Sequence, residues 1–89
     1  MKSVWVFHGE CAEICTAVFS DKSTADIWIE QNLLSGTVRK LPIDISVYDW
    51  VIKEGFFSPK NEHQKSSIFI QTFTSAYIEH YHYTNGKQE

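Results

Sequence analysis

The residues best suited to chemistry lie near the C-terminus, in residues 77–84 (YIEHYHYT). Histidines and tyrosines alternate there with a period of two, as side chains do on the two faces of a β-strand. His80 and His82 therefore share one face, and two imidazoles at this spacing can bind one metal ion together. Glu79 shares the other face with the tyrosines. This strand is where a polar site would meet the fold.

A third imidazole, His8, follows an apolar run at the N-terminus. If the first strand pairs with the last, His8 would join His80 and His82, with Glu10 nearby, and three ligands plus water are what a catalytic zinc site uses. The chain contains no CxxC or HExxH pattern, however. Histidines turned inward would be hydrogen-bonding groups, whereas histidines turned outward beside Glu10 would form a polar site. We expect the inward orientation.

Other catalytic arrangements are weakly indicated. His8 could work with Glu10 or Glu79 in acid–base catalysis, but a carboxylate among tyrosines commonly accepts a cross-strand hydrogen bond. Cys11 and Cys15 fall around a predicted turn, where we expect reduced, structural thiols. The four glycines are scattered one per turn and form no phosphate-binding loop. The sequence therefore leans away from an enzyme and predicts no cofactor.

Tyrosines with scattered acids are also typical of protein-binding surfaces, since tyrosine gives a large contact area at a low cost in conformational entropy. Buried tyrosines with satisfied hydroxyls are the alternative for two or three of them. The residues that we assign to a partner-binding face are Asp44, Tyr48, Asp49, Glu54, Glu62, Glu79, Tyr81 and Tyr83.

Length and composition limit the possible functions. Eighty-nine residues suffice for one small domain, expected over residues 1–89, and an aromatic content of 15% supplies ample core volume. A formal charge of -3, without a basic stripe, argues against direct nucleic-acid binding. No apolar run is long enough for a signal or membrane segment, so we expect a cytoplasmic protein.

The helices and strands that must position these residues are predicted from the periodicity of apolar residues and from the residues that end helices and strands. Strands are predicted at residues 3–8, 14–19, 37–41 and 76–84, and helices at 22–32, 47–54 and 67–73, with Ser20 or Asp21 capping the first helix and Gly55 ending the second. Residues 85–89 are expected to be a frayed tail. The order β-β-α-β-α-α-β predicts an α+β two-layer sandwich, with helices on one side of an antiparallel or mixed four-stranded sheet.

The chain also resembles a family of small bacterial domains of unknown function. The resemblance covers nearly the whole chain and rests on its start (WVFHGE, 5–10), its middle (VYDW, 47–50; PK, 59–60; HQ, 63–64) and its end (EHYHY, 79–83). It implies a stand-alone bacterial protein without an assigned activity. Cys11 and Cys15 lie outside these motifs.

Two functions remain open. By analogy with other small acidic domains that lack a catalytic set, the first is a non-enzymatic immunity protein that binds and neutralises a cognate protein toxin, with a nuclease toxin as one case. The second is a small enzyme or metal-binding domain built on His8, His80 and His82. We favour the first, because no catalytic constellation is visible.

Overall fold

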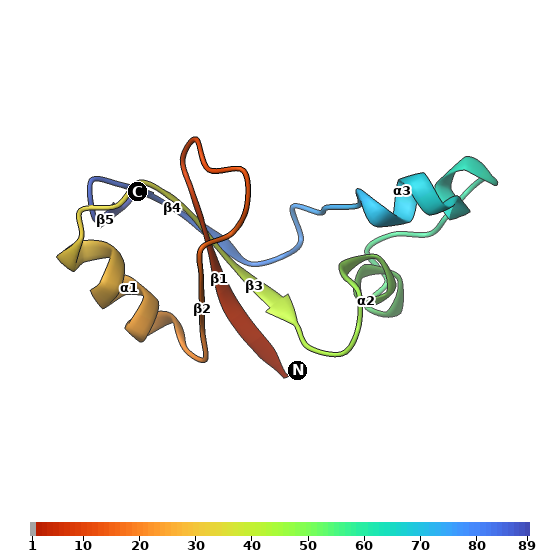
Figure 1. Cartoon of the computed structure of the whole chain (residues 1–89). Coiled ribbons are helices and arrows are strands. Elements are labelled where there is room, and N and C mark those ends of the chain that lie inside the picture. The colour runs from red at the N-terminus through yellow and green to blue at the C-terminus, as the bar shows by residue number, and fades with distance from the viewer. Residues whose placement is uncertain (1) are drawn as a thin grey trace.

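The computed structural model describes residues 2–89, which form a five-stranded antiparallel sheet and three α-helices (Figure 1). The strands lie in the spatial order β2-β1-β3-β4-β5. Their bounds are β1 (Ser3–Gly9), β2 (Ala17–Phe19), β3 (Gly36–Pro42), β4 (His80–Thr84) and β5 (Lys87–Gln88). The helices are α1 (Lys22–Gln31), α2 (Val47–Lys53) and α3 (Ser67–Gln71), with a 3-10 turn, η1 (His63–Lys65). The predicted α+β class is confirmed.

The fifth strand corrects the prediction of a four-stranded sheet with a frayed tail. Asn85 and Gly86 have φ angles of 50° and 87°, so the chain reverses in two residues and Lys87 pairs with Thr84. An Asn-Gly dipeptide is the usual signal for such a hairpin, because both central residues need positive φ. The end of the chain therefore closes the edge of the sheet.

The pairing of β1 with the last strand, on which the three-histidine arrangement depended, is also wrong. β1 lies between β2 and β3, and β3 separates it from β4. In this register His8 is opposite Thr37, and Thr37 is opposite His82. His8 and His82 thus lie on one row across the sheet, but two strands apart.

Helix α1 covers one face of the sheet. Asp21 caps its N-terminus by accepting a 2.8 Å hydrogen bond from the Thr24 amide. Its buried stripe, Ala25 and Ile29, packs on the side of the sheet that carries the core residues. These core residues are Trp5, Phe7, Val38 and Tyr83, with half-buried Phe19, Trp28 and Tyr81 beside them. The first helix and its cap are as predicted.

The other helices do not form part of that layer. Residues 43–79, which we call the helical insertion, join two neighbouring antiparallel strands, β3 and β4, and extend beyond the end of the sheet (Figure 1). The molecule is consequently elongated, with extents of 45 × 27 × 20 Å. The expectation that all helices pack on one side of the sheet holds for α1 alone, and residues 76–79, expected in the last strand, precede β4 as an irregular segment.

The helical insertion has its own aromatic cluster, formed by Tyr48, Phe57, Phe69 and Phe73, with ring centroids 5.3–6.2 Å apart. Ser46 caps α2 and Ser66 caps α3, each by accepting a hydrogen bond from an amide three residues later. Gly55, with φ 80°, ends α2 as predicted. The buried residues of α2 are Tyr48 and Val51.

Candidate functional site

The uncovered face of the sheet holds all three histidines of the predicted site. Tyr81 and Tyr83 point toward α1, whereas His80 and His82 are exposed on the opposite face. The expectation of inward histidines is therefore wrong. The packing of α1 decides which face of β4 is buried, because the apolar stripe of the helix packs against the large tyrosine rings. Side chains alternate along a strand, so the histidines then lie on the opposite, exposed face.

Each of these three histidines makes a hydrogen bond, which is local in sequence for His8 and His80 and crosses from β4 to β3 for His82. His80 donates from Nδ1 to the Ile78 carbonyl at 2.7 Å, and His8 donates from Nε2 to the Ala12 carbonyl at 2.7 Å. His82 Nδ1 lies 3.1 Å from the Thr37 hydroxyl, and the rings of His80 and His82 are 5.4 Å apart. Within residues 2–89, no group of three or more His, Cys, Asp or Glu side chains is placed to hold a metal ion.

Two hollows meet on this uncovered face, and His8 and Arg39 line both. The polar hollow, of about 460 Å³, is lined among others by Glu10, Thr37 and His82. The apolar hollow, of about 410 Å³, is lined by Val6, Ile14 and Leu41, together with Glu13 and Cys15. Glu10 thus lines the same hollow as His8 and His82, which is the polar arrangement considered for outward histidines.

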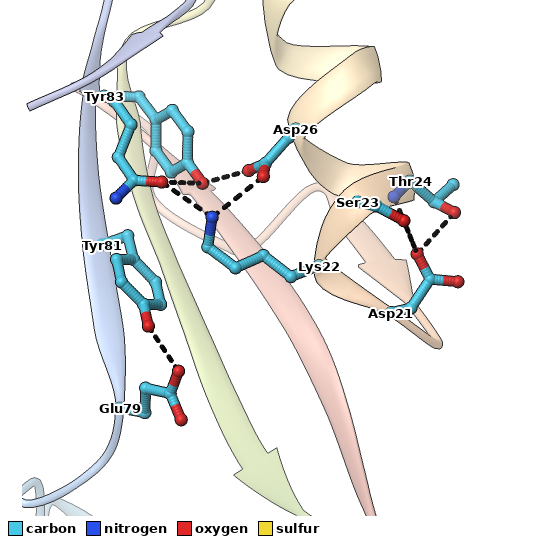
Figure 2. Close-up of polar contacts among 9 residues, drawn as sticks. Asp21, Lys22, Ser23, Thr24, Asp26, Glu79, Tyr81 and Tyr83 are labelled. Carbon is cyan, nitrogen blue, oxygen red and sulfur yellow. Dashed lines mark hydrogen bonds and ion pairs between the residues drawn. The ribbon is translucent and has the colours of Figure 1, made fainter.

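The tyrosine face of β4 instead forms a polar network with α1 (Figure 2). The Tyr83 hydroxyl donates to Asp26, and Lys22 lies 2.9 Å from the same carboxyl group and 2.7 Å from the side-chain oxygen of Gln88. Lys22 also lies 4.4 Å from the centre of the Tyr81 ring, within cation–π range. This network joins α1 to β4 and β5.

The network shifts the pKa values of its phenols. Burial, followed by the hydrogen bond to Asp26, raises the pKa of Tyr83 far above its usual range. The hydrogen bond to Glu79, at 2.5 Å, raises the pKa of Tyr81. At the start of α1, hydrogen bonds from Ser23 and Thr24 lower the pKa of Asp21. Both tyrosines therefore remain neutral donors, which suits a structural role.

The residues assigned to a partner-binding face are divided by the structure. Tyr48 is 7% exposed, and its hydroxyl donates to the Gln64 carbonyl at 2.7 Å inside the helical insertion. Tyr83 is 4% exposed. The expected surface position is wrong for both, because their rings fill the two aromatic cores. The acids are all exposed, four of them in or beside the helices of the insertion and one just before β4: Asp44, Asp49, Glu54, Glu62 and Glu79.

An exposed aromatic group on the helical insertion was missed by sequence reasoning. Phe56 stacks on Tyr77 with ring centroids 4.4 Å apart, and the two residues are 45% and 61% exposed. Trp50 lies 6.0 Å from Phe56 and lines a hollow of about 660 Å³ with Asp44 and Glu54. We call Trp50, Phe56 and Tyr77 the aromatic stack. Its signal in the sequence is Phe56 directly after the helix-ending Gly55, a position outside any predicted apolar stripe.

The two cysteines lie on the β1–β2 connection. Cys11 and Cys15 are both exposed and unpaired with each other, and Cys11 adopts a φ angle of 67°. Free thiols were the expected state for both residues. Cys11 lines the polar hollow, and Cys15 lines the apolar one.

Fold and surface define the class: a small α+β domain with an uncovered sheet face and a helical insertion that carries exposed aromatic rings. Residues 4–89 match the family described as "Domain of unknown function (DUF7710)", and the chain belongs to this family. The resemblance to a family without an assigned function is thereby confirmed. No curated protein and no solved structure matches the chain significantly. In the described part of the chain, no helix has the length and apolar character needed to cross a bilayer.

Proposed function

We propose that this protein is a non-enzymatic protein-binding domain, and more narrowly an immunity protein that binds and neutralises a cognate toxin. The observation that supports this proposal is the aromatic stack. Large aromatic rings are enriched at the centres of protein interfaces and rarely remain exposed together without a partner.

The surroundings of the stack indicate the charge of the partner. Asp44 and Glu54 line the hollow beside Trp50, although Lys2 and Lys53 line it too. The helical insertion as a whole holds five acids and three lysines, and so contributes two of the three net negative charges of the chain. An aromatic centre with an acidic excess around it favours a partner with a basic surface, because charge complementarity raises the association rate and excludes other partners. A toxin that binds nucleic acid would present such a surface.

The test begins with the reading frame adjacent to this gene. If it encodes a toxin, co-expression should suppress its toxicity, and the two proteins should co-purify as a complex. The double variant Phe56→Ser/Tyr77→Ser should weaken the complex at least about 30-fold, in line with the loss of central aromatic residues from an interface.

The matched control is Ile68→Ser, which removes a 64% exposed apolar side chain from α3, outside the aromatic stack. This variant should bind as the wild type does. Equal weakening by both changes, or the absence of any complex with the adjacent gene product, would contradict the proposal. Asp44→Asn/Glu54→Gln should mainly slow association, with an effect that shrinks at high salt.

A further inference from the structure

Arg39 occupies the centre of the uncovered sheet face. It lies opposite Val6 on one neighbouring strand and opposite His80 on the other, and its side chain is exposed. Across residues 2–89, the ion pairs are Lys22–Asp26, Lys40–Glu79 and Lys65–Glu62, so Arg39 has no carboxylate within pairing distance. A guanidinium group between an apolar side chain and a sheet histidine is well placed to bind a planar anion.

The two hollows differ in polarity, and together they suit a ligand with one polar end and one apolar end. The polar hollow offers the Thr37 hydroxyl and the His82 ring beside Arg39, and the apolar hollow offers Val6, Leu41 and the 72% exposed Ile14. Arg39 lines both hollows and therefore lies where the polar and apolar ends of a ligand would join. Volumes of about 460 and 410 Å³ are within the range of small-molecule sites.

We propose that this face binds an aliphatic monocarboxylate, with its carboxylate on Arg39 and Thr37 and its hydrocarbon chain against Val6, Ile14 and Leu41. A carboxylate matches the two parallel N–H donors of a guanidinium group. The hydrocarbon chain gains from leaving water in the apolar hollow. This site lies on the sheet, apart from the aromatic stack, and does not depend on the proposed toxin binding.

The acids around the hollows disfavour a ligand with two negative charges more strongly than a ligand with one. Glu10 and Glu89 line the polar hollow, and Glu13 lines the apolar one. These carboxylates repel a dianion such as the HPO₄²⁻ form of phosphate more strongly than a monoanion, because the repulsion scales with the ligand charge. Selectivity for a monocarboxylate over phosphate therefore separates this proposal from a general anion site.

The experiment is a titration of the ¹⁵N-labelled full-length protein, followed by NMR chemical shifts at pH 7. The probe is 4-methylpentanoate, and the comparison compounds are 4-methylpentanamide, acetate and inorganic phosphate. Saturable shifts at Val6, Thr37, Arg39 and Leu41 are expected, with a Kd on the order of 1–20 mM for a ligand of this size. The amide, acetate and phosphate should each bind at least about fivefold more weakly, since each lacks one of the features that the site recognises.

Arg39→Gln should weaken 4-methylpentanoate binding at least about tenfold, whereas Lys40→Gln should leave it unchanged. Lys40 is the matched control, because it is the next cation on the same strand but faces the other way, 5.8 Å from the centre of the Trp5 ring. Ile14→Ser should weaken 4-methylpentanoate about threefold and leave acetate unaffected. Equal effects of the Arg39 and Lys40 changes, equal binding of the amide, or no saturable shifts would each overturn the proposal.

The carboxylate could belong to a free small molecule or to a peptide C-terminus, and the same titration distinguishes the two sources. The tripeptide Gly-Gly-Leu with a free carboxyl group should bind more tightly than 4-methylpentanoate if peptide ends are the ligand, and more weakly if a free acid is. In either case the Arg39→Gln change should abolish the difference between the carboxylate and its amide.

Discussion

The sheet with α1 and the helical insertion are stabilised in different ways. In the sheet, residues far apart in sequence pair along whole strands, and α1 buries Ile29 against Val38 and the tyrosine face of β4. In the insertion, the elements are only seven, three and five residues long, too short to be stable as isolated helices. Rings packed around Tyr48 hold them together instead.

The proposed binding surface belongs to the region that the sheet does not need. The insertion connects two strands that a tight turn could join, so the sheet does not need it to close. A segment that the sheet does not require, and that keeps Phe56 and Tyr77 exposed, is well suited to carry a binding surface on a rigid base. The sheet itself contributes the second candidate surface, the face that α1 leaves open.

The largest expected effect is on the sheet. Gly36→Ala would place a Cβ atom 2.4 Å from the His8 carbonyl oxygen and 2.9 Å from the Gly9 Cα. Both obstacles are backbone of the paired strand, so β1 and β3 must move apart, and we expect a loss of about 3 kcal/mol in the free energy of unfolding. Chemical denaturation followed by circular dichroism measures this loss.

The control for Gly36 belongs to the insertion. Gly55→Ala meets no atom within 4 Å, and its only penalty is the φ angle of 80°. A cost of about 1 kcal/mol is expected, since a left-handed conformation is the sole strain. If Gly55→Ala proved as costly as Gly36→Ala, the insertion would be as tightly constrained as the sheet, and the two regions would not differ in this respect.

The second effect should be local to the insertion. Phe69→Ala removes a half-buried ring that contacts Tyr48, Phe57 and Phe73, at a cost of about 2–3 kcal/mol. Hydrogen exchange should show faster exchange of the α2 and α3 amides, with the β1 and β3 amides still protected. Ile68→Ala, which changes an exposed neighbour, should cost less than about 0.5 kcal/mol. Uniform loss of protection in the Phe69 variant would show that the two regions unfold as one unit.

The third effect concerns the network between α1 and β4. Tyr83→Phe removes the hydrogen bond to the Asp26 carboxylate, and we expect a loss of about 1–2 kcal/mol at pH 7. Because the folded pKa of Tyr83 is raised, its contribution is complete below the ordinary tyrosine pKa of about 10 and is lost as the pH rises above it. The wild type should therefore lose stability above pH 10 more steeply than Tyr83→Phe does in thermal melts, and parallel pH profiles would contradict this.

The smallest effect is at the start of α1. Hydrogen bonds lower the pKa of Asp21, so its stabilising contribution is present above the ordinary aspartate pKa of 3.8 and is lost as the pH falls through the lower pKa of the folded state. Asp21→Ala should lower the melting temperature slightly at pH 7, and this difference should shrink in acid, because protonation removes the charge of Asp21 but leaves a carbonyl oxygen that can still accept the capping hydrogen bond. Asp21→Asn, which keeps the capping oxygen, should retain most of the wild-type stability at both pH values.

Most local structure was predictable from the sequence. The first strand, the α1 cap at Asp21 and the end of α2 at Gly55 follow from period, capping residues and glycine, all of which act over a few neighbouring residues. The hairpin at Asn85–Gly86 had an equally local signal, and the expectation of a frayed tail overlooked it. At the candidate site, the sequence placed His80 and His82 together on one face and predicted free thiols at Cys11 and Cys15.

The sequence by itself determined which side chains share a face, because a strand alternates whatever surrounds it. Only the tertiary structure decided which face is buried and which strands are neighbours. α1 packed onto the tyrosines and left the histidines exposed, and β3 came between His8 and His82. The order of the strands and the choice of the buried face depend on packing between residues far apart in the sequence. This packing minimises the exposed apolar area of the whole chain, a quantity that no short run of residues determines.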